Sequence, residues 1–160
     1  MAACTARPKP APVTPTPSGP TDSQSNLPPP GPVSQAPVPG SVQDFVINAG
    51  DRIYFDFDSY TIRSDAGPVL DAQSAWLQRY PAVAVRIEGN ADERGTREYN
   101  LALGARRANS VRDYLVNRGI QASRIATVSY GKEQPIDPGT SEDSYQRNRN
   151  AHTTLTSGAR

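Results

Sequence analysis

The sequence predicts an α/β (α+β) fold: a two-layer sandwich with two main helices on one face of a small, mixed four-stranded sheet. Three observations predict this class. Short apolar runs alternate with two longer stretches of helical periodicity in residues 41–160. The expected order is strand, helix, strand, helix, strand, strand, and two right-handed crossovers in that order place both helices on one face. Twelve of the sixteen prolines lie in residues 1–40, which therefore precede the domain as a separate segment.

Residues 1–40 are rich in Pro, Ala, Thr, Ser, Val, Gln and Gly. Such a segment lacks the apolar content for a core, so we expect a disordered tether with polyproline II character. It starts with Met-Ala-Ala-Cys, and small residues before a cysteine resemble the end of a bacterial lipobox. We expect Cys4 to carry a lipid anchor and interpret the chain as one that begins near the cleavage site. The alternative is an incidental free thiol.

The first part of the domain contains a strand and a helix. Residues 41–48 fit either a short helix or a strand. Residues 52–57 alternate as a strand, with Ile53, Phe55 and Phe57 on one face and Asp58 at its end. A helix is expected over 65–79, capped by Ser64 and closed by Pro81. Its inner stripe comprises Val69, Leu70, Gln73, Trp76, Leu77 and Tyr80.

The second part contains a central strand and the longest helix. Residues 82–88 are mostly apolar on both faces, which is typical of a central strand. A polar loop over 89–95 follows, and Thr96 is the expected N-cap of a helix that ends at Arg118-Gly119. Strands are then expected over 124–129 and, more weakly, over 151–156. The residues between 131 and 144 form a surface loop, and Tyr145 to Arg149 lead into the last strand.

One side of the longest helix is apolar or small apart from two polar residues, Asn100 and Arg107. The side consists of Asn100, Leu103, Gly104, Arg107, Ala108, Val111, Tyr114 and Leu115. Arg106 points away from it. A guanidinium on a core-facing stripe carries a desolvation cost unless it is paired, and the loop carboxylate of Asp92 is a candidate partner.

Composition excludes several classes. The formal net charge is +1 with both signs mixed, which excludes the basic patch of a nucleic-acid-binding protein. There is one cysteine and one histidine, His152, so neither a disulfide framework nor a Cys/His metal cluster is expected. No apolar run approaches the roughly 20 residues that cross a bilayer.

Three motifs resemble one family. The motifs are NADERGTREYNLALGARRANSVRDYL, SYGKEQP and, near the C-terminus, NRN. They are similar to the OmpA-like peptidoglycan-binding domain family, and most of all to its lipoproteins. The resemblance extends from Phe45 to about Thr156. One departure is Asn150, which stands where the family usually has a second arginine.

The resemblance implies a ligand, the stem peptide of peptidoglycan held through its diaminopimelate residue. It assigns ligand-binding roles to Asp58, Asp92, Asn100, Arg107, Asn148 and Arg149. Diaminopimelate ends in an ammonium and a carboxylate. Arg107 can bind the carboxylate with two parallel hydrogen bonds, and Asp58 can accept from the ammonium. Asp92 precedes a helix N-terminus, where it can orient Arg107, accept from the ligand or fix the loop.

The resemblance also implies a location and a partner. We expect a lipoprotein on the periplasmic face of a Gram-negative outer membrane, tethered by acylated Cys4. Its expected partners are peptidoglycan and the periplasmic β-propeller of the Tol system, which gives it a part in envelope integrity and cell division. No cofactor is expected.

The sequence also allows purely structural roles for several of these residues. Asp92 and Arg107 can form a purely structural ion pair, and Arg94 and Arg97 are interpreted as solvated loop charges. Tyr99 is interpreted as a core or rim residue, and His152 as structural.

Carboxylate pairs such as Asp92-Glu93 or Asp56/Asp58 suggest a glycosidase as an alternative function. We expect non-catalytic binding instead, because the sequence offers no set of nucleophile, base and orienting group. A protein–protein adaptor is the other candidate, whereas a stator or porin module would need membrane segments.

Overall fold

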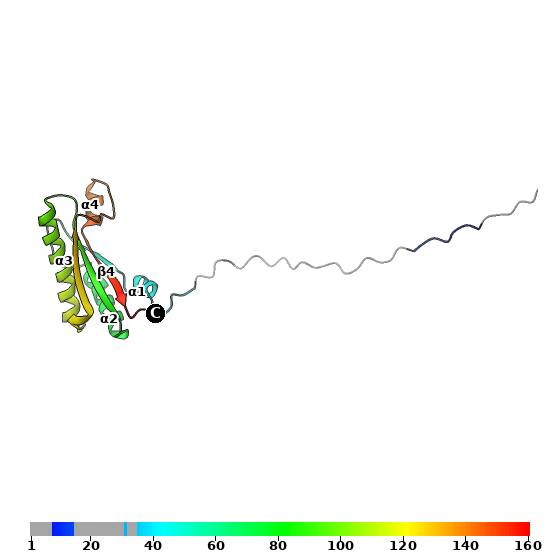
Figure 1. Cartoon of the computed structure of the whole chain (residues 1–160), viewed down its shortest axis with the longest axis horizontal. Coiled ribbons are helices and arrows are strands. Elements are labelled where there is room, and N and C mark those ends of the chain that lie inside the picture. The colour runs from blue at the N-terminus through cyan, green and yellow to red at the C-terminus, as the bar shows by residue number, and fades with distance from the viewer. Residues whose placement is uncertain (1–7, 15–30, 32–34) are drawn as a thin grey trace, which may run out of the picture. The chain divides into compact units, whose positions relative to one another are not determined.

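The computed structural model describes residues 8–14, 31 and 35–160 of the chain (Figure 1). It divides into two units, Met1–Ser34 and Gln35–Arg160, and every helix and strand of the described residues belongs to the second. The predicted lipidation site, Cys4, and most of the predicted tether lie outside the described residues. Within the described part, no helix has the length and hydropathy that would span a membrane.

The sheet has four strands in the order β1-β4-β2-β3. They are β1 (Arg52–Tyr54), β2 (Ala84–Asn90), β3 (Ile125–Gly131) and β4 (Asn150–Ser157). β2 runs parallel to β3, and β4 runs antiparallel to both β1 and β2, so the sheet is mixed as predicted. The last strand, expected to be weak, lies in the interior of the sheet, and β2 is central as its apolar pattern indicated.

The two main helices cover one face of this sheet, which confirms the predicted architecture (Figure 1). They are α2 (Gly67–Arg79) and α3 (Arg97–Asn117). Ile87 of β2 is fully buried, and Thr153 lies opposite it on β4. The Thr153 hydroxyl donates to Gln73 of α2 at 3.1 Å, so α2 lies over the same face as Ile87.

The N-terminal half of α3 lies directly on the end of β2. At this contact Gly104 of α3 meets Gly89 of β2, and a Cβ atom built on Gly89 would come within 1.7 Å of the Gly104 carbonyl oxygen. Only glycine permits such an approach of two backbones. The close contact brings the loop that follows β2 next to the first turns of α3.

Three short elements complete the domain: α1 (Val42–Asn48), the 3₁₀ turn η1 (Ala122–Arg124) and α4 (Glu142–Asn148). The first, which the sequence left open between helix and strand, is a helix. Ser41 caps it by accepting from the Asp44 amide at 3.1 Å. The expectations that the surface loop continues to residue 144 and that residues 145–149 only lead into β4 were wrong, because α4 begins at Glu142, directly after its N-cap Ser141.

Several boundaries differ from the prediction. β2 spans Ala84–Asn90 rather than 82–88, and β3 spans Ile125–Gly131 rather than 124–129. α2 begins at Gly67 rather than residue 65, with Pro68 in its first turn and Ala66 in place of Ser64 at the N-cap position. β1 ends at Tyr54, so Phe57 does not join Ile53 on the core face and is 60% exposed. The chain turns after Phe55, whose amide donates to the Arg149 carbonyl at 2.8 Å.

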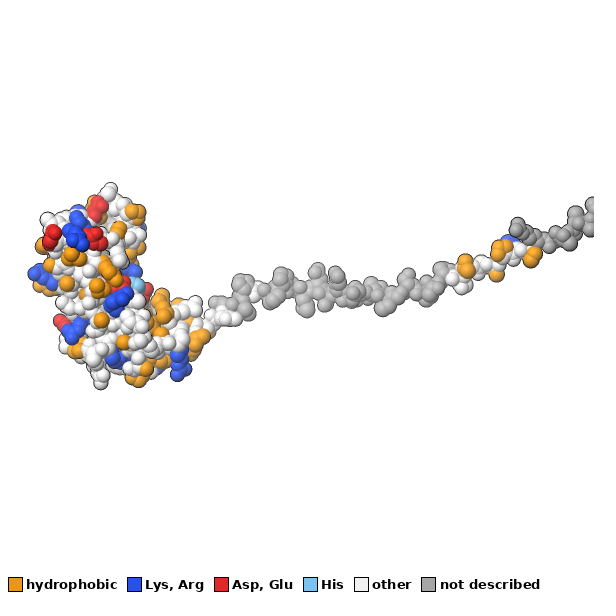
Figure 2. Space-filling model, in the orientation of Figure 1, with side chains coloured by type: hydrophobic (Ala, Val, Ile, Leu, Met, Phe, Trp, Pro, Cys, Tyr) orange, Lys and Arg blue, Asp and Glu red, His pale blue; other side chains and the backbone are white. Residues whose placement is uncertain are grey.

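Charged side chains of both signs lie side by side at the end of the folded unit that carries α4 (Figure 2). Ion pairs also connect α4 and the loop that follows β2 to their surroundings, among them Arg94 with Asp92 at 2.8 Å and Arg149 with Glu142 at 2.9 Å. This end of the domain also contains the loops that follow β1 and β2.

Candidate ligand-binding site

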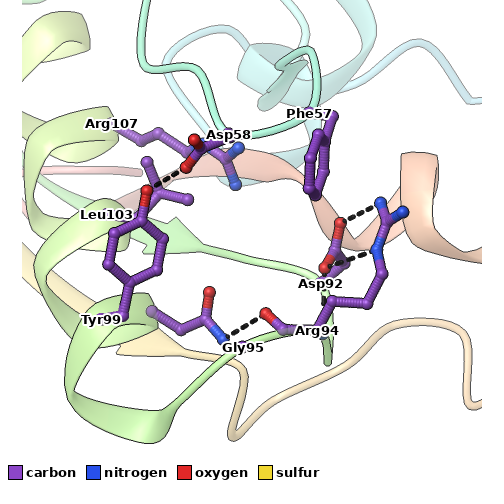
Figure 3. A pocket seen from close by; sticks show the side chains of 9 residues that line it. Phe57, Asp58, Asp92, Arg94, Gly95, Tyr99, Leu103 and Arg107 are labelled. Atoms are coloured by element: carbon purple, nitrogen blue, oxygen red, sulfur yellow. Dashed lines mark hydrogen bonds and ion pairs between the residues drawn. The ribbon is translucent and has the colours of Figure 1, made fainter.

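A pocket of about 220 Å³ opens between the β1–α2 loop, the β2–α3 loop and the first turns of α3 (Figure 3). Its walls combine charged, aromatic and aliphatic side chains. They are Phe57, Asp58, Asp92, Arg94, Gly95, Tyr99, Asn100, Leu103 and Arg107. Four of the six ligand-binding residues assigned from the resemblance therefore lie together at one pocket.

Arg107 is completely buried and is held by three backbone carbonyls. Its Nε donates to Ser59 at 2.7 Å, Nη1 to Asn90 at 2.8 Å and Nη2 to Asp56 at 3.1 Å. These contacts join the β1–α2 loop to the end of β2. A guanidinium has five N–H donors, so these three bonds leave two that the carbonyls do not use, and Arg107 is one of the residues that line the pocket.

Arg107 keeps its charge in this buried position. Burial lowers the pKa of its guanidinium to about 10, while the carboxylates of Asp92 and Asp58 act in the opposite direction. A pKa of about 10 leaves the group cationic at neutral pH. The ring of Phe55, 5.2 Å from Cζ, adds a cation–π contact.

Asp58 supplies an exposed carboxylate beside Arg107 (Figure 3). Its backbone is left-handed, with φ of 51°, a conformation that aspartate adopts more readily than most residues. The carboxylate accepts a hydrogen bond from the Tyr99 hydroxyl, which raises the pKa of Tyr99. Tyr99 lies in the first turn of α3, where its amide donates to the N-cap residue Thr96 at 3.2 Å.

Asp92, the candidate partner of Arg107, forms its ion pairs with other residues. Its carboxylate accepts from the Arg94 amide at 3.1 Å and from the Arg94 guanidinium at 2.8 Å, and Arg149 donates to it at 3.3 Å. Burial raises the pKa of Asp92, but the hydrogen bonds from Arg94 outweigh it and the net shift is downward. Of the three roles left open, this geometry matches the fixing of the loop.

Arg94 is part of the site, contrary to its interpretation as a solvated charge. Its guanidinium lies across the pocket from Arg107, next to Asp92 and Phe57 (Figure 3). Its backbone carbonyl accepts from the side-chain amide of Asn100 at 2.8 Å. Asn100 therefore lines the pocket and also holds the loop, which explains a polar residue on the buried face of α3.

Asn148 and Arg149 lie behind the pocket rather than in its wall. The Asn148 side chain accepts from the amides of Ile136 and Asp137, at 2.8 and 3.0 Å, and so fixes the loop before α4. Arg149, 3% exposed, connects Asp92 to the carbonyl of Phe55. The structure thus places these two as supports of the loops that form the site.

Asn150 is fully buried next to this support. Its side-chain oxygen accepts from Arg52 at 2.7 Å and from Asn90 at 3.0 Å. Asn150, which stands where the family usually has a second arginine, therefore lies between β1 and β2 in the sheet and does not line the pocket.

Phe57, Tyr99 and Leu103 line the pocket but were not assigned to it from the sequence. The alternation of β1 placed Phe57 in the core, and α3 periodicity placed Leu103 there. The signal that could have found Phe57 is its position next to Asp58 at a strand end. Among the described residues, no group of three His, Cys, Asp or Glu side chains could hold a metal ion.

Comparison with known proteins places these features in a family. The family model described as the OmpA family matches residues 54–149. The peptidoglycan-associated lipoprotein of Rhizobium meliloti is 57% identical over 120 residues, which cover 75% of this chain and 68% of the relative. That of Brucella melitensis is 53% identical over 125 residues, covering 78% and 74%.

Solved structures agree with this likeness. The crystal structure of the peptidoglycan-associated lipoprotein from Burkholderia pseudomallei superposes with a TM-score of 0.65 at 40% identity, covering 66% of this chain and 90% of that one. The C-terminal domain of Helicobacter pylori MotB shares the fold, with a TM-score of 0.62 at 23% identity, covering 67% and 84%. The chain belongs to the OmpA family and is a homologue of the peptidoglycan-associated lipoproteins.

Proposed function

We propose that this protein binds peptidoglycan without catalysing a reaction, and that its ligand is the diaminopimelate residue of the stem peptide. The observation that carries the proposal is one pocket in which a buried arginine with two free N–H donors lies beside an exposed carboxylate. Arg107 would bind the ligand carboxylate and Asp58 the ligand ammonium. The names of the homologous lipoproteins support association with peptidoglycan.

The pocket suits a zwitterion because both charges are prepositioned. Three carbonyls hold the Arg107 guanidinium, and the Tyr99 hydroxyl holds the Asp58 carboxylate, which retains acceptor capacity for an ammonium. Little side-chain freedom is lost on binding to groups that are already fixed. Leu103 and the ring of Phe57 can cover the aliphatic part of diaminopimelate between its charged ends.

The wider proposal is that the chain tethers the outer membrane to the cell wall. Homology to lipoproteins and the cysteine at position 4 support a lipid anchor, and the Pro-rich segment between Cys4 and the domain supports a spacer. We further propose docking to the β-propeller of the Tol system. The pocket wall includes the exposed aromatic side chains of Phe57 and Tyr99, and aromatic residues are enriched at protein interfaces. Docking there would compete with the stem peptide.

The test of the binding proposal uses two synthetic stem peptides that differ only at the third position, diaminopimelate or lysine. Lysine retains the amine but lacks the carboxylate that Arg107 would bind. In calorimetric titration of the full chain we expect the lysine peptide to bind at least about tenfold more weakly. Equal affinity for both peptides would refute the proposed recognition.

A variant tests the other half of the zwitterion. Asp58→Asn keeps a residue that tolerates the left-handed backbone and can accept from Tyr99, but it removes the charge that faces the ammonium. We expect at least about a tenfold loss of affinity for the diaminopimelate peptide. Asp143→Asn, an exposed acid on α4 away from the pocket, is the matched control and should bind as wild type.

A further inference from the structure

The guanidinium of Arg94 contacts two aromatic rings from different parts of the chain. Its Cζ atom lies 4.3 Å from the ring centroid of Phe57 and 4.4 Å from that of Tyr145. Asp92 holds the edge of the same guanidinium through Nη2, at 2.8 Å, and Nε, at 3.3 Å. Arg94 is therefore restrained by one carboxylate and by two aromatic rings.

Tyr145 belongs to α4 and does not line the pocket, whereas Phe57 does. The Tyr145 hydroxyl donates to Glu93 at 3.0 Å, and Glu142, also in α4, lies 3.7 Å from Arg94. One short helix thus contacts the β2–α3 loop through a ring, a hydroxyl and a carboxylate.

Phe57 needs such support because the core does not provide it. Its side chain is 60% exposed and is not part of the buried hydrophobic cluster. An exposed ring is free to adopt several rotamers unless a neighbour restrains it. The described neighbour that stacks on it is the Arg94 guanidinium.

On the basis of the proposed function, we propose that Tyr145 is a positioning residue for the ligand pocket. Its ring holds the Arg94 guanidinium in place, and Arg94 in turn holds the Phe57 ring that forms one wall. The effect on the ligand is indirect: preorganising this wall reduces the side-chain ordering that binding would otherwise require. α4 thereby contributes to binding although none of its side chains lines the pocket.

Three substitutions test separate parts of this group of side chains. Tyr145→Leu removes the ring, whereas Tyr145→Phe keeps the ring and removes only the hydroxyl contact to Glu93. Arg94→Lys keeps a cation near Asp92 but lacks the flat face that stacks on aromatic rings. If Tyr145 acts through Arg94, Tyr145→Leu should have no further effect in the Arg94→Lys background.

The chain offers a matched control. Tyr114 on α3 also lies over an arginine, Arg118, with 5.2 Å between Cζ and the ring centroid, and its hydroxyl donates to Asp71 at 2.7 Å. This second group of tyrosine, arginine and aspartate is not part of the pocket wall. Tyr114→Leu therefore reproduces the loss of a ring and a hydroxyl without touching the proposed stack.

The experiment is calorimetric titration of the full chain with the diaminopimelate stem peptide, with thermal unfolding measured for each variant. We expect Tyr145→Leu to bind about fivefold more weakly, and Tyr145→Phe and Tyr114→Leu to bind as wild type. Because Phe57 also lies over Arg94, the NMR signal of the Arg94 Nε–H should lose part of its ring-current shift in Tyr145→Leu and keep all of it in Tyr145→Phe.

Three results would overturn the inference: wild-type affinity in Tyr145→Leu, equal losses in Tyr145→Leu and Tyr114→Leu, or a full additional loss from Tyr145→Leu in the Arg94→Lys background. Should Tyr145→Leu fail to fold, Tyr145→Gln, which also removes the ring, takes its place, and wild-type affinity in that variant would overturn the inference. A wild-type chain that does not bind the peptide would refute the proposed function itself, which is a distinguishable outcome.

Discussion

A buried arginine is the residue on which the site depends. Arg107 lies on the core-facing side of α3. Its N–H groups donate hydrogen bonds to backbone carbonyls rather than to a carboxylate. An ion pair inside the domain would satisfy the guanidinium and leave less of it for a ligand. Carbonyl partners fix its geometry while leaving its positive charge uncompensated by direct contact, which favours an anionic ligand group.

We expect substitutions of Arg107 and of its neighbour Arg106 to differ in their effect on peptidoglycan binding. Arg107→Ala should abolish co-sedimentation with purified peptidoglycan and lower the free energy of unfolding by about 2–5 kcal/mol, because three carbonyls lose their donor. Arg107→Lys retains the charge but has no planar fork, so it should also bind weakly. Arg106→Ala, at an exposed position, should sediment as wild type. Equal losses in the two alanine variants, or normal binding by Arg107→Lys, would contradict the role given to Arg107.

At the scale of elements, the loops of the site are held by neighbours that lie outside the pocket. Arg149 connects Asp92 to the backbone after β1, and the Asn148 side chain fixes the loop before α4. The Gly89–Gly104 contact sets the distance between β2 and α3. The pocket is therefore formed by rigid elements rather than by its own loops alone, as precise recognition requires.

α1 contacts α2 through a carboxylate that should make the stability of the fold depend on pH. The Asp44 carboxylate accepts from the Gly40 amide at 2.8 Å and from the Trp76 indole at 2.9 Å, and these bonds lower its pKa. A carboxyl with a depressed folded-state pKa stabilises the fold above its unfolded pKa, near 4, and loses this contribution as pH falls through the lower folded value.

We therefore expect urea unfolding of the wild type to show decreasing stability from pH 5 to pH 3, with a change in the fluorescence of Trp76, the single tryptophan. Asp44→Asn should be less stable by about 1–3 kcal/mol at pH 7 and should depend less on pH below 5. Asp92 also has a lowered pKa, so some dependence should persist. An unchanged pH profile in Asp44→Asn would contradict this assignment.

At the scale of the whole molecule, a folded domain follows a Pro-rich segment that begins close to a cysteine. The proposed tether needs both ends: a lipid at Cys4 and peptidoglycan at the pocket. Because the two attachments are separate in the chain, either can be removed while the other is tested.

Cys4→Ala, expressed from a full-length lipoprotein precursor in a Gram-negative cell, should leave the outer-membrane fraction but still sediment with purified peptidoglycan. The physical reason is that the lipid alone supplies membrane affinity. Fractionation with immunoblotting measures the first outcome, and Ser34→Ala in the same segment is the control. Retention of Cys4→Ala in the membrane would contradict the lipid anchor.

Hydrophobic periodicity was enough to predict the mixed sheet, both main helices and the buried face of α3. Leu103, Arg107, Val111 and Leu115 all lie on that face, and Arg106 does not. Such predictions succeed because a side chain's direction along a helix or strand follows from local backbone geometry. Phe57 was misplaced because the strand ended earlier than its alternation suggested.

Residue patterns and the family resemblance were enough to predict the fold class and to name Asp58, Asp92, Asn100 and Arg107 as candidate site residues. The bonding partners of two of them became known from the folded structure: Asp92 bonds to Arg94 and Arg149, while Arg107 bonds to three carbonyls. These bonds join residues up to 57 positions apart in the sequence. Which of several nearby donors bonds to one acceptor depends on the distances between them, and tertiary packing sets those distances.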